Sequence, residues 1–172
     1  GIPVVLVDPH RSVGSTPQLI RTIADAVGKP DAGEALVKRT QEQIDQAKKQ
    51  IAAWKPAKPM RVAFLYVRGN AGVFFILGSE NGASELIQGV GADDVASDKG
   101  ITTLVPANAE SLVSINPDAI FVMRDGLAST GGMKGLLARA GGANTTAGRK
   151  QRVSAIPDGI SRAFGPQTGE GL

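Results

Sequence analysis

The sequence predicts an α/β fold in which a mainly parallel sheet follows a long bridging helix. Apolar runs typical of buried strands, at residues 61–66 and 118–123, alternate with helical patterns. A continuous helical pattern precedes them at residues 31–54, and a proline-rich stretch at 55–59 separates the two parts. A long amphipathic helix that ends at such a hinge usually bridges two units.

Composition limits the classes of protein that the chain can represent. Its 172 residues, 42% of them hydrophobic and 20% charged, suffice for an ordinary globular core. The 19 basic residues are spread among 16 acidic ones, so we expect no nucleic-acid partner. The chain has no cysteine and one histidine, which excludes thiolate sites and argues against a histidine-built zinc site. No apolar run of about 18 residues occurs that would span a membrane.

The first part of the chain predicts a strand and then a helix. Residues 3–7 are apolar and typical of a buried strand. The chain starts at Gly1, with no methionine or leader before this strand, so we expect it to be processed or cut. Ser15 and Gln18 predict a capping box at the start of a helix that ends at Gly28.

The second helix is the bridging one, and Asp31 with Glu34 signals its start. Its predicted apolar face comprises Leu36, Thr40, Ile44, Ala47, Ile51 and Trp54. Lysine and glutamine occupy the opposite side, as expected for a face in solvent. We interpret Trp54 as a packing anchor at the end of this helix.

The remainder of the chain alternates strands with helices. We expect a strand at 61–66, a glycine loop, an extended piece at 73–77, a helix at 82–90, a helix from Asn108 to Ile115, a strand at 118–123, a glycine-rich loop at 125–132 that leads into a helix at 133–140, and a strand at 152–156. Ligands of parallel sheets bind at the carboxyl ends of the strands. Tyr66, Met123 and Arg124 lie at such ends.

Tyr66 is the only tyrosine of the chain, and Arg68 follows it where the strand meets the glycine loop. Residues i and i+2 of a strand point to the same side, so we expect the two side chains to be neighbours. A nearby guanidinium favours the ionised form of a phenol, and tyrosinate is an axial ligand of iron in some haem proteins. By itself the pattern is more typical of a half-buried tyrosine whose hydroxyl meets water.

A series of sequence blocks restricts the protein families that the chain can belong to: "GEALVKRTQEQIDQ", "RVAFLY", "GASELIQGVGADDV", "PANAESLVSINPDAIFVM", "GLASTGGMKGLLA" and "TTAGRKQRVSAIPDG". In order and spacing they resemble the class III substrate-binding proteins of bacterial ABC importers, within the haem-binding branch. The resemblance implies two α/β lobes joined by one long helix, with the ligand between them. On that plan residues 1–30 are a remnant of the N-terminal lobe, 31–57 the linking helix and hinge, and 58–172 a Rossmann-like C-terminal lobe. Most of the N-terminal lobe would then be missing.

The same resemblance implies a binding function without catalysis. A protein of this kind captures ferric haem outside the cytoplasm, as a cell-surface lipoprotein or a periplasmic protein, and delivers it to an ABC transporter permease. Tyr66 would be the haem-iron ligand, and Arg68 would tune it. Further candidate haem contacts are Gly69, Asn70, Met123, Arg124 and His10. The loop of residues 69–72 would leave room for a flat macrocycle against the backbone.

Each of the weaker candidates has a simpler interpretation. Met123 is more typical of core packing, and Arg124 and His10 are equally or more typical of solvated loop positions. Relatives dock on the permease through an acidic side chain near the top of the lobe, where Glu85 lies, but a solvated helix face fits Glu85 better. In several relatives the first lobe adds a histidine ligand, and no residue here corresponds to it. The family's second lobe normally closes with a further helix, and we expect that helix to be short or cut off in this chain, which stops at Leu172.

Two other functions stay open. A siderophore or cobalamin carrier of the same class would not need a tyrosine followed by x-Arg at a strand end. An α/β enzyme of flavodoxin or hydrolase type is disfavoured by the absence of cysteine and of a G-x-S-x-G motif. Residues 3–7 would lack sheet neighbours without the first lobe. We therefore expect the fragment either to self-associate, as in a homodimer formed by strand exchange, or to leave its first residues disordered.

Overall fold

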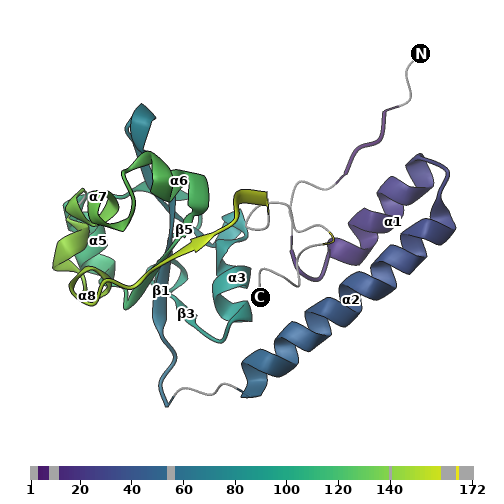
Figure 1. Cartoon of the computed structure of the whole chain (residues 1–172), viewed down its shortest axis with the longest axis horizontal. Coiled ribbons are helices and arrows are strands. Elements are labelled where there is room, and N and C mark those ends of the chain that lie inside the picture. The colour runs from purple at the N-terminus through teal and green to yellow at the C-terminus, as the bar shows by residue number, and fades with distance from the viewer. Residues whose placement is uncertain (1–3, 8–11, 54–56, 140, 160–165, 167–172) are drawn as a thin grey trace.

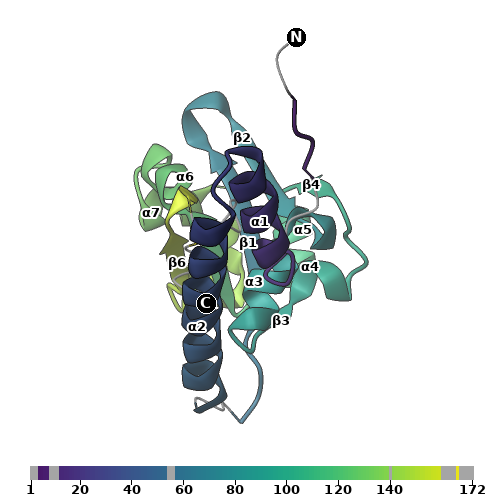
Figure 2. The same ribbon diagram turned by 90° about the vertical axis from the view of Figure 1, so that its right-hand side faces the viewer.

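The chain forms a helix pair and a sheet lobe that carries helices on both of its faces (Figure 1). This arrangement comes from a computed structural model, which describes residues 4–7, 12–53, 57–139, 141–159 and 166. The pair, α1 and α2, lies beside the lobe, and the chain enters the sheet only after α2 has ended (Figure 2).

The two helices of the pair are α1 (Thr16–Ala26) and α2 (Pro30–Ala53). They pack closely, because a Cβ atom added to Gly33 would lie 2.4 Å from the Cβ of Ala24. Gly28, with φ of +67°, makes the turn between them. The helix predicted at residues 31–54 is confirmed up to Ala53, and Trp54 lies outside the described residues. The buried residues of α2 are Gly33, Val37, Thr40 and Ile44.

Two expectations for the N-terminal part are wrong. Residues 4–7 belong to no strand, and Val4 and Leu6 are 78% and 89% exposed, because a strand needs a neighbour to satisfy its backbone groups. The capping box of Ser15 and Gln18 does not form. The backbone N–H groups of Ser12 and Ser15 instead donate to each other's hydroxyl oxygens, both at 2.9 Å.

The sheet contains β1 (Arg61–Arg68), β2 (Val73–Leu77), β3 (Asp93–Asp94), β4 (Leu104–Pro106), β5 (Ala119–Met123) and β6 (Val153–Ile156). Its order is β4-β2-β1-β5-β6, with β3 paired to the start of β1. β1 pairs in parallel with β3 and β5, and β5 in parallel with β6, which confirms the mainly parallel α/β sheet. β2 departs from this direction. It forms an antiparallel hairpin with β1 and also pairs antiparallel with β4.

Helices connect and cover these strands. They are α3 (Ala83–Gly89), α4 (Val95–Asp98), α5 (Ala109–Ile115), α6 (Arg124–Ser129), α7 (Met133–Ala138) and α8 (Thr146–Arg149). Asn108 caps α5 as predicted, since its side chain accepts from the Ser111 N–H while the Ser111 hydroxyl accepts from the Asn108 N–H. In the part of the chain that the structure describes, no helix is both long and apolar enough to cross a membrane.

The glycine-rich segment at 125–132 is not the loop that the sequence predicts, because α6 begins directly after β5 and occupies most of it. The helix lies tightly on β1, where a Cβ atom on Gly126 would be 2.7 Å from the Val67 carbonyl oxygen. Gly131 and Gly132, with φ of +83° and +84°, then make the turn that leads into α7.

The alternating side chains of β1 divide the core into two layers. Ala63, Leu65 and Val67 face the layer that α4, α5, α7 and α8 cover. Val62 and Phe64 face the layer that α3 covers. Tyr66 continues this second face toward the carboxyl end of the strand and packs against the same layer, but it is only partly buried. The sheet thereby directs Tyr66 to the edge of the core.

Candidate functional site

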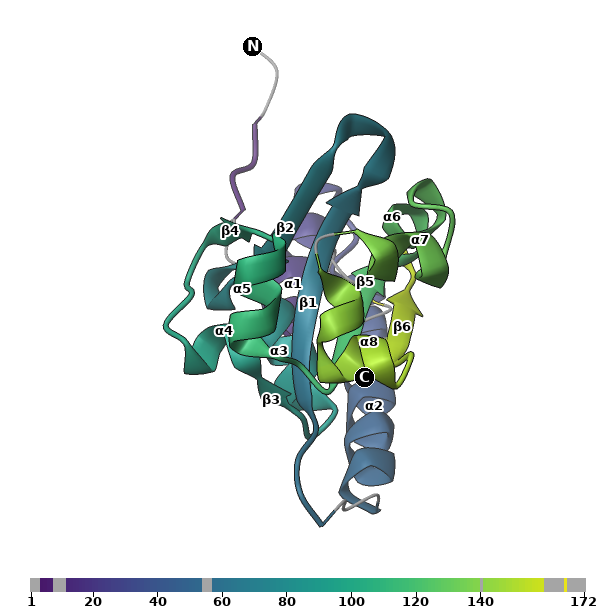
Figure 3. The same cartoon turned by 90° about the vertical axis from the view of Figure 1, so that its left-hand side faces the viewer.

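The candidate site lies at the carboxyl ends of the parallel strands β1, β5 and β6. The β1–β2 hairpin extends past the ends of the other two strands, beside α6 (Figure 3). Tyr66 is half-buried on β1, and its partner across the hairpin is the half-buried Phe75. Residues that face each other in an antiparallel pair share one side of the sheet, so the two aromatic residues border the same surface.

Arg68 covers the ring of Tyr66. The guanidinium carbon lies 4.8 Å from the ring centroid, which is the geometry of a cation–π contact. Nη1 of Arg68 donates to the carbonyl oxygen of Val67 at 2.8 Å. The expected adjacency of residues i and i+2 is therefore present, and the cation meets the face of the ring.

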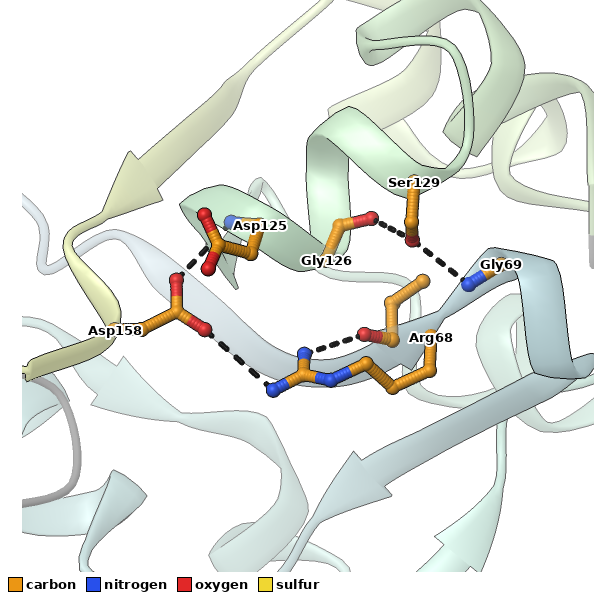
Figure 4. Close-up of polar contacts among 7 residues, drawn as sticks. Arg68, Gly69, Asp125, Gly126, Ser129 and Asp158 are labelled. Atoms are coloured by element: carbon orange, nitrogen blue, oxygen red, sulfur yellow. Dashed lines mark hydrogen bonds and ion pairs between the residues drawn. The ribbon is translucent and has the colours of Figure 1, made fainter.

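A carboxylate holds the other side of Arg68. Nη2 of Arg68 lies 3.5 Å from Oδ1 of Asp158, in an ion pair whose two side chains are 34% and 26% exposed. Oδ2 of Asp158 accepts from the backbone N–H of Asp125 at 3.0 Å (Figure 4). Asp158 follows β6, Asp125 follows β5 and Arg68 ends β1, so each of the three neighbouring strands contributes one residue.

A second set of contacts fixes the start of the hairpin loop to α6. The N–H of Gly69 donates to the Ser129 hydroxyl at 2.8 Å, and that hydroxyl donates to the Gly126 carbonyl oxygen at 2.6 Å (Figure 4). A Cβ atom on Gly69 would lie 2.5 Å from the Ser129 carbonyl oxygen. The space beside the Cα atom of Gly69 is therefore occupied by α6. Asn70 is exposed in the loop.

The other residues that the sequence suggested as haem or permease contacts lie in different environments. Met123 is only 2% exposed and belongs to the second core layer, in agreement with its simpler interpretation. Arg124 is exposed at the first position of α6. His10 lies outside the described residues. Glu85 is half-buried and its Oε2 accepts from the Val13 N–H at 2.6 Å, so the solvated-face interpretation of Glu85 is wrong.

Sequence reasoning missed Asp158 and Ser129. A signal for Asp158 existed, because Pro157, Asp158 and Gly159 directly follow the predicted last strand and thus lie at the carboxyl edge of the sheet. Ser129 gave no such signal, since the helix that carries it was predicted to be a loop.

The chemistry of this site is that of one phenol oxygen beside a cation. Among the described residues, no group of three or more histidine, cysteine, aspartate or glutamate side chains is arranged to bind a metal ion. A single phenol oxygen cannot enclose a bare ion. It suits a metal that a chelating ligand already holds and that lacks only an axial donor.

Comparisons with known proteins bear on this geometry. The family model described as periplasmic binding protein matches residues 1–159. The haem-binding protein HmuT is 49% identical with a TM-score of 0.93, over 99% of this chain and 55% of that one. The periplasmic haem-binding protein RhuT from Roseiflexus sp. RS-1 is 34% identical with a TM-score of 0.86, over 93% and 60%. Periplasmic haem-binding protein BhuT, solved with two haems, is 30% identical with a TM-score of 0.83, over 95% and 60%.

The chain thus spans a little over half the length of the solved proteins that it matches. Solved variants of HmuT include one with a tyrosine replaced by alanine and one with the arginine two positions later replaced by alanine. This is the spacing of Tyr66 and Arg68. Comparison with curated protein sequences gives no match.

Proposed function

This chain belongs to the periplasmic binding protein family, and from that premise we propose that it is the haem-binding lobe of an extracytoplasmic substrate-binding protein. Its role is to capture ferric haem and deliver it to an ABC transporter permease, without catalysis. The protein is either periplasmic or a lipoprotein held at the cell surface. Similarity to three haem-binding proteins over nearly the whole chain supports this assignment.

In this proposal residues 58–172 form the C-terminal lobe, 31–57 link it to the other lobe, and 1–30 belong to that N-terminal lobe. An apolar groove of about 310 Å³ on the helix pair supports the division. Ile23 and Val27 line the groove and are 51% and 63% exposed. A second lobe packed there would remove this apolar surface from water.

The observation that carries the proposal is the contact between Tyr66 and Arg68 at the carboxyl end of β1. Tyr66 supplies the axial oxygen ligand for ferric iron, because it is the one tyrosine of the chain and its side chain is only half-buried. Arg68 places a positive charge over the ring of the phenol, in a favourable cation–π contact with the ligand side chain. Phe75 offers an apolar ring beside the ligand for contact with the porphyrin.

The test is a titration with ferric haem, followed by absorbance. We expect the parent chain to give a Soret band together with charge-transfer bands of tyrosinate-bound iron. Tyr66→Phe retains the ring and removes the ligand atom, so haem affinity should fall by roughly tenfold to a hundredfold or more, since loss of even an outer-shell partner costs this much at metal sites. Tyr66→Ala should lose at least as much.

Arg152→Ala is the matched control, because Arg152 is an exposed arginine at the opposite edge of the sheet, just before the start of β6. Its affinity should stay close to that of the parent. A Tyr66→Phe variant that keeps the parent's spectrum and affinity would contradict ligation by Tyr66. A purified protein that carries a flavin or a corrin would point to the enzyme or to the cobalamin alternative.

A further inference from the structure

We propose that Asp158 is a positioning residue that holds the Arg68 guanidinium over the ring of Tyr66. This inference rests on the proposed function, because it concerns how the iron-ligating phenol keeps its neighbouring cation. The resemblance of the chain to known proteins implies a role for Tyr66 and Arg68 but none for Asp158.

The position of Arg68 depends on contacts at both ends of its guanidinium. Nη1 is hydrogen-bonded to the Val67 carbonyl oxygen and Nη2 is paired with Asp158 (Figure 4). The planar group lies over the ring of Tyr66. The Val67 contact comes from the residue next to Arg68 itself. Asp158 is the member of the set that comes from another part of the chain, after β6 and 90 residues away.

Asp158 is itself held in place. Its Oδ2 accepts from the Asp125 N–H in the first turn of α6, so the carboxylate is anchored to the end of β5 while its Oδ1 faces Arg68. The carboxylate thus bridges the backbone of one strand end and the side chain of another. Such an arrangement favours one orientation of a long, rotatable arginine side chain.

The bound ligand creates a need for this anchor. Haem carries two propionates, and a carboxylate near the cleft would attract an unanchored guanidinium away from the ring. Asp158 already supplies Arg68 with a carboxylate partner that belongs to the protein, at a position that keeps the guanidinium over the ring. Arg124, exposed at the same edge, stays available for a propionate.

The first test uses the haem-free chain and NMR. A guanidinium over an aromatic ring has side-chain resonances shifted upfield by the ring current, and Tyr66→Leu gives the reference without the ring. We expect Asp158→Asn to lose at least half of the upfield shift of the Arg68 δ and ε protons. The asparagine carbonyl still accepts from the Asp125 N–H, so α6 retains its contact. Asp158→Glu should preserve most of the shift.

Asp125→Asn is the matched control, because it removes an acidic group at the same edge and leaves the backbone N–H in place. It should leave the Arg68 shift unchanged. An Asp158→Asn chain with the parent's shift would overturn the proposal, and so would a parent chain whose Arg68 shift equals that of Tyr66→Leu. A thermal unfolding curve of each variant shows whether the variant is folded. It thereby separates a specific loss of the Arg68 chemical shift from a loss caused by unfolding.

The second test uses the chain loaded with ferric haem. Asp158→Asn and Arg68→Ala should move the phenolate-to-iron charge-transfer band in the same direction, and the double variant should move it no further than Arg68→Ala alone. Additive shifts would overturn action through Arg68. If the parent chain binds no haem, the proposed function fails, and the NMR result by itself decides whether Asp158 positions Arg68.

Discussion

Arg68 contributes modestly to the stability of the fold. A cation–π contact contributes about 0.5–1 kcal/mol when exposed and about 2 kcal/mol when desolvated. A partly exposed ion pair such as that with Asp158 adds roughly 0–1 kcal/mol. Arg68 variants should therefore fold, and their effect on haem binding can be measured without interference from unfolding.

Arg68→Ala should weaken haem binding less than the loss of Tyr66, because it removes a neighbouring charge and leaves the proposed iron ligand in place. If the variant forfeits an interaction of about 0.5–2 kcal/mol, affinity falls by roughly twofold to thirtyfold. Arg68→Lys retains the charge but not the planar group that lies on the ring, so it should fall between the parent and Arg68→Ala. Haem titration followed by absorbance measures the series. A loss equal to that of Tyr66→Ala would mean that Arg68 binds haem directly.

The contact between α6 and β1 depends on a residue without a side chain. Gly126→Ala would bring a Cβ atom to 2.7 Å from the Val67 carbonyl oxygen and 3.5 Å from Nη1 of Arg68. The helix must move away from the strand, at a cost of about 1–3 kcal/mol. At about 2–4 °C per kcal/mol for a chain of this size, we expect a measurable fall in Tm together with weaker haem binding.

Gly159→Ala is the control for this substitution, since no atom of the residues that the structure describes lies within 4 Å of the added Cβ atom. Calorimetry of both variants gives the comparison. Equal Tm values for the two would show that α6 adapts without cost and that its close approach to β1 is not needed.

The helix pair contains its own pH-dependent contact. Nε and Nη2 of Arg21 donate to the two carboxylate oxygens of Glu34 at 2.6 and 3.0 Å. The hydrogen bond from Arg21 lowers the pKa of Glu34 below its usual value. A carboxyl group with a lowered pKa in the folded state stabilises the fold above its unfolded pKa, and this stabilisation is lost as the pH falls through the folded pKa.

Glu34→Gln should therefore lower Tm relative to the parent at neutral pH, and the difference should shrink as the pH falls from about 5 to about 3. Both side chains are largely exposed, so the effect should be small and should weaken in high salt. Glu42→Gln changes an exposed glutamate of the same helix and serves as the control. A Tm difference that stays constant over this pH range would contradict the prediction.

At the scale of the whole molecule, the N-terminal segment of residues 4–7 stands out, because it is apolar but belongs to no strand. Val4, Val5, Leu6 and Val7 are 78%, 52%, 89% and 37% exposed, although their apolar character is typical of a buried strand. A segment of this kind gains backbone partners by pairing with a second chain. An exchange between two copies would bury the segment in both of them.

Residues 1–172 should accordingly sediment as a dimer in a concentration-dependent manner, and deletion of residues 1–14 should shift the chain toward the monomer. Replacing Val4 and Leu6 with serine tests the same idea at constant length. Val113→Ser is the matched control, because Val113 is 46% exposed on α5, away from this segment. A monomer whose first residues pack against their own chain would contradict the prediction.

Much of the architecture followed from local patterns. The helix to Ala53, the capped helix after Asn108 and the strand at 119–123 were all predictable, because periodicity and capping act within a few residues of the chain. Tyr66 was singled out in the same way, by its place at the end of β1. The antiparallel direction of β2 was not, since a short apolar run carries no information on which neighbour it pairs with.

Only the tertiary structure decided how the site is assembled. Arg68 and Asp158 are 90 residues apart, and nothing in either segment indicates the other. Their contact exists because the parallel order β1-β5-β6 brings three strand ends to one edge. The role of Gly69 and Gly126 was likewise hidden, because a glycine is compatible with a loop, a turn or a close contact, and the position of α6 on β1 selects the close contact. Sequence patterns thus determined which residue types stand at strand ends, whereas long-range packing determined which of them meet.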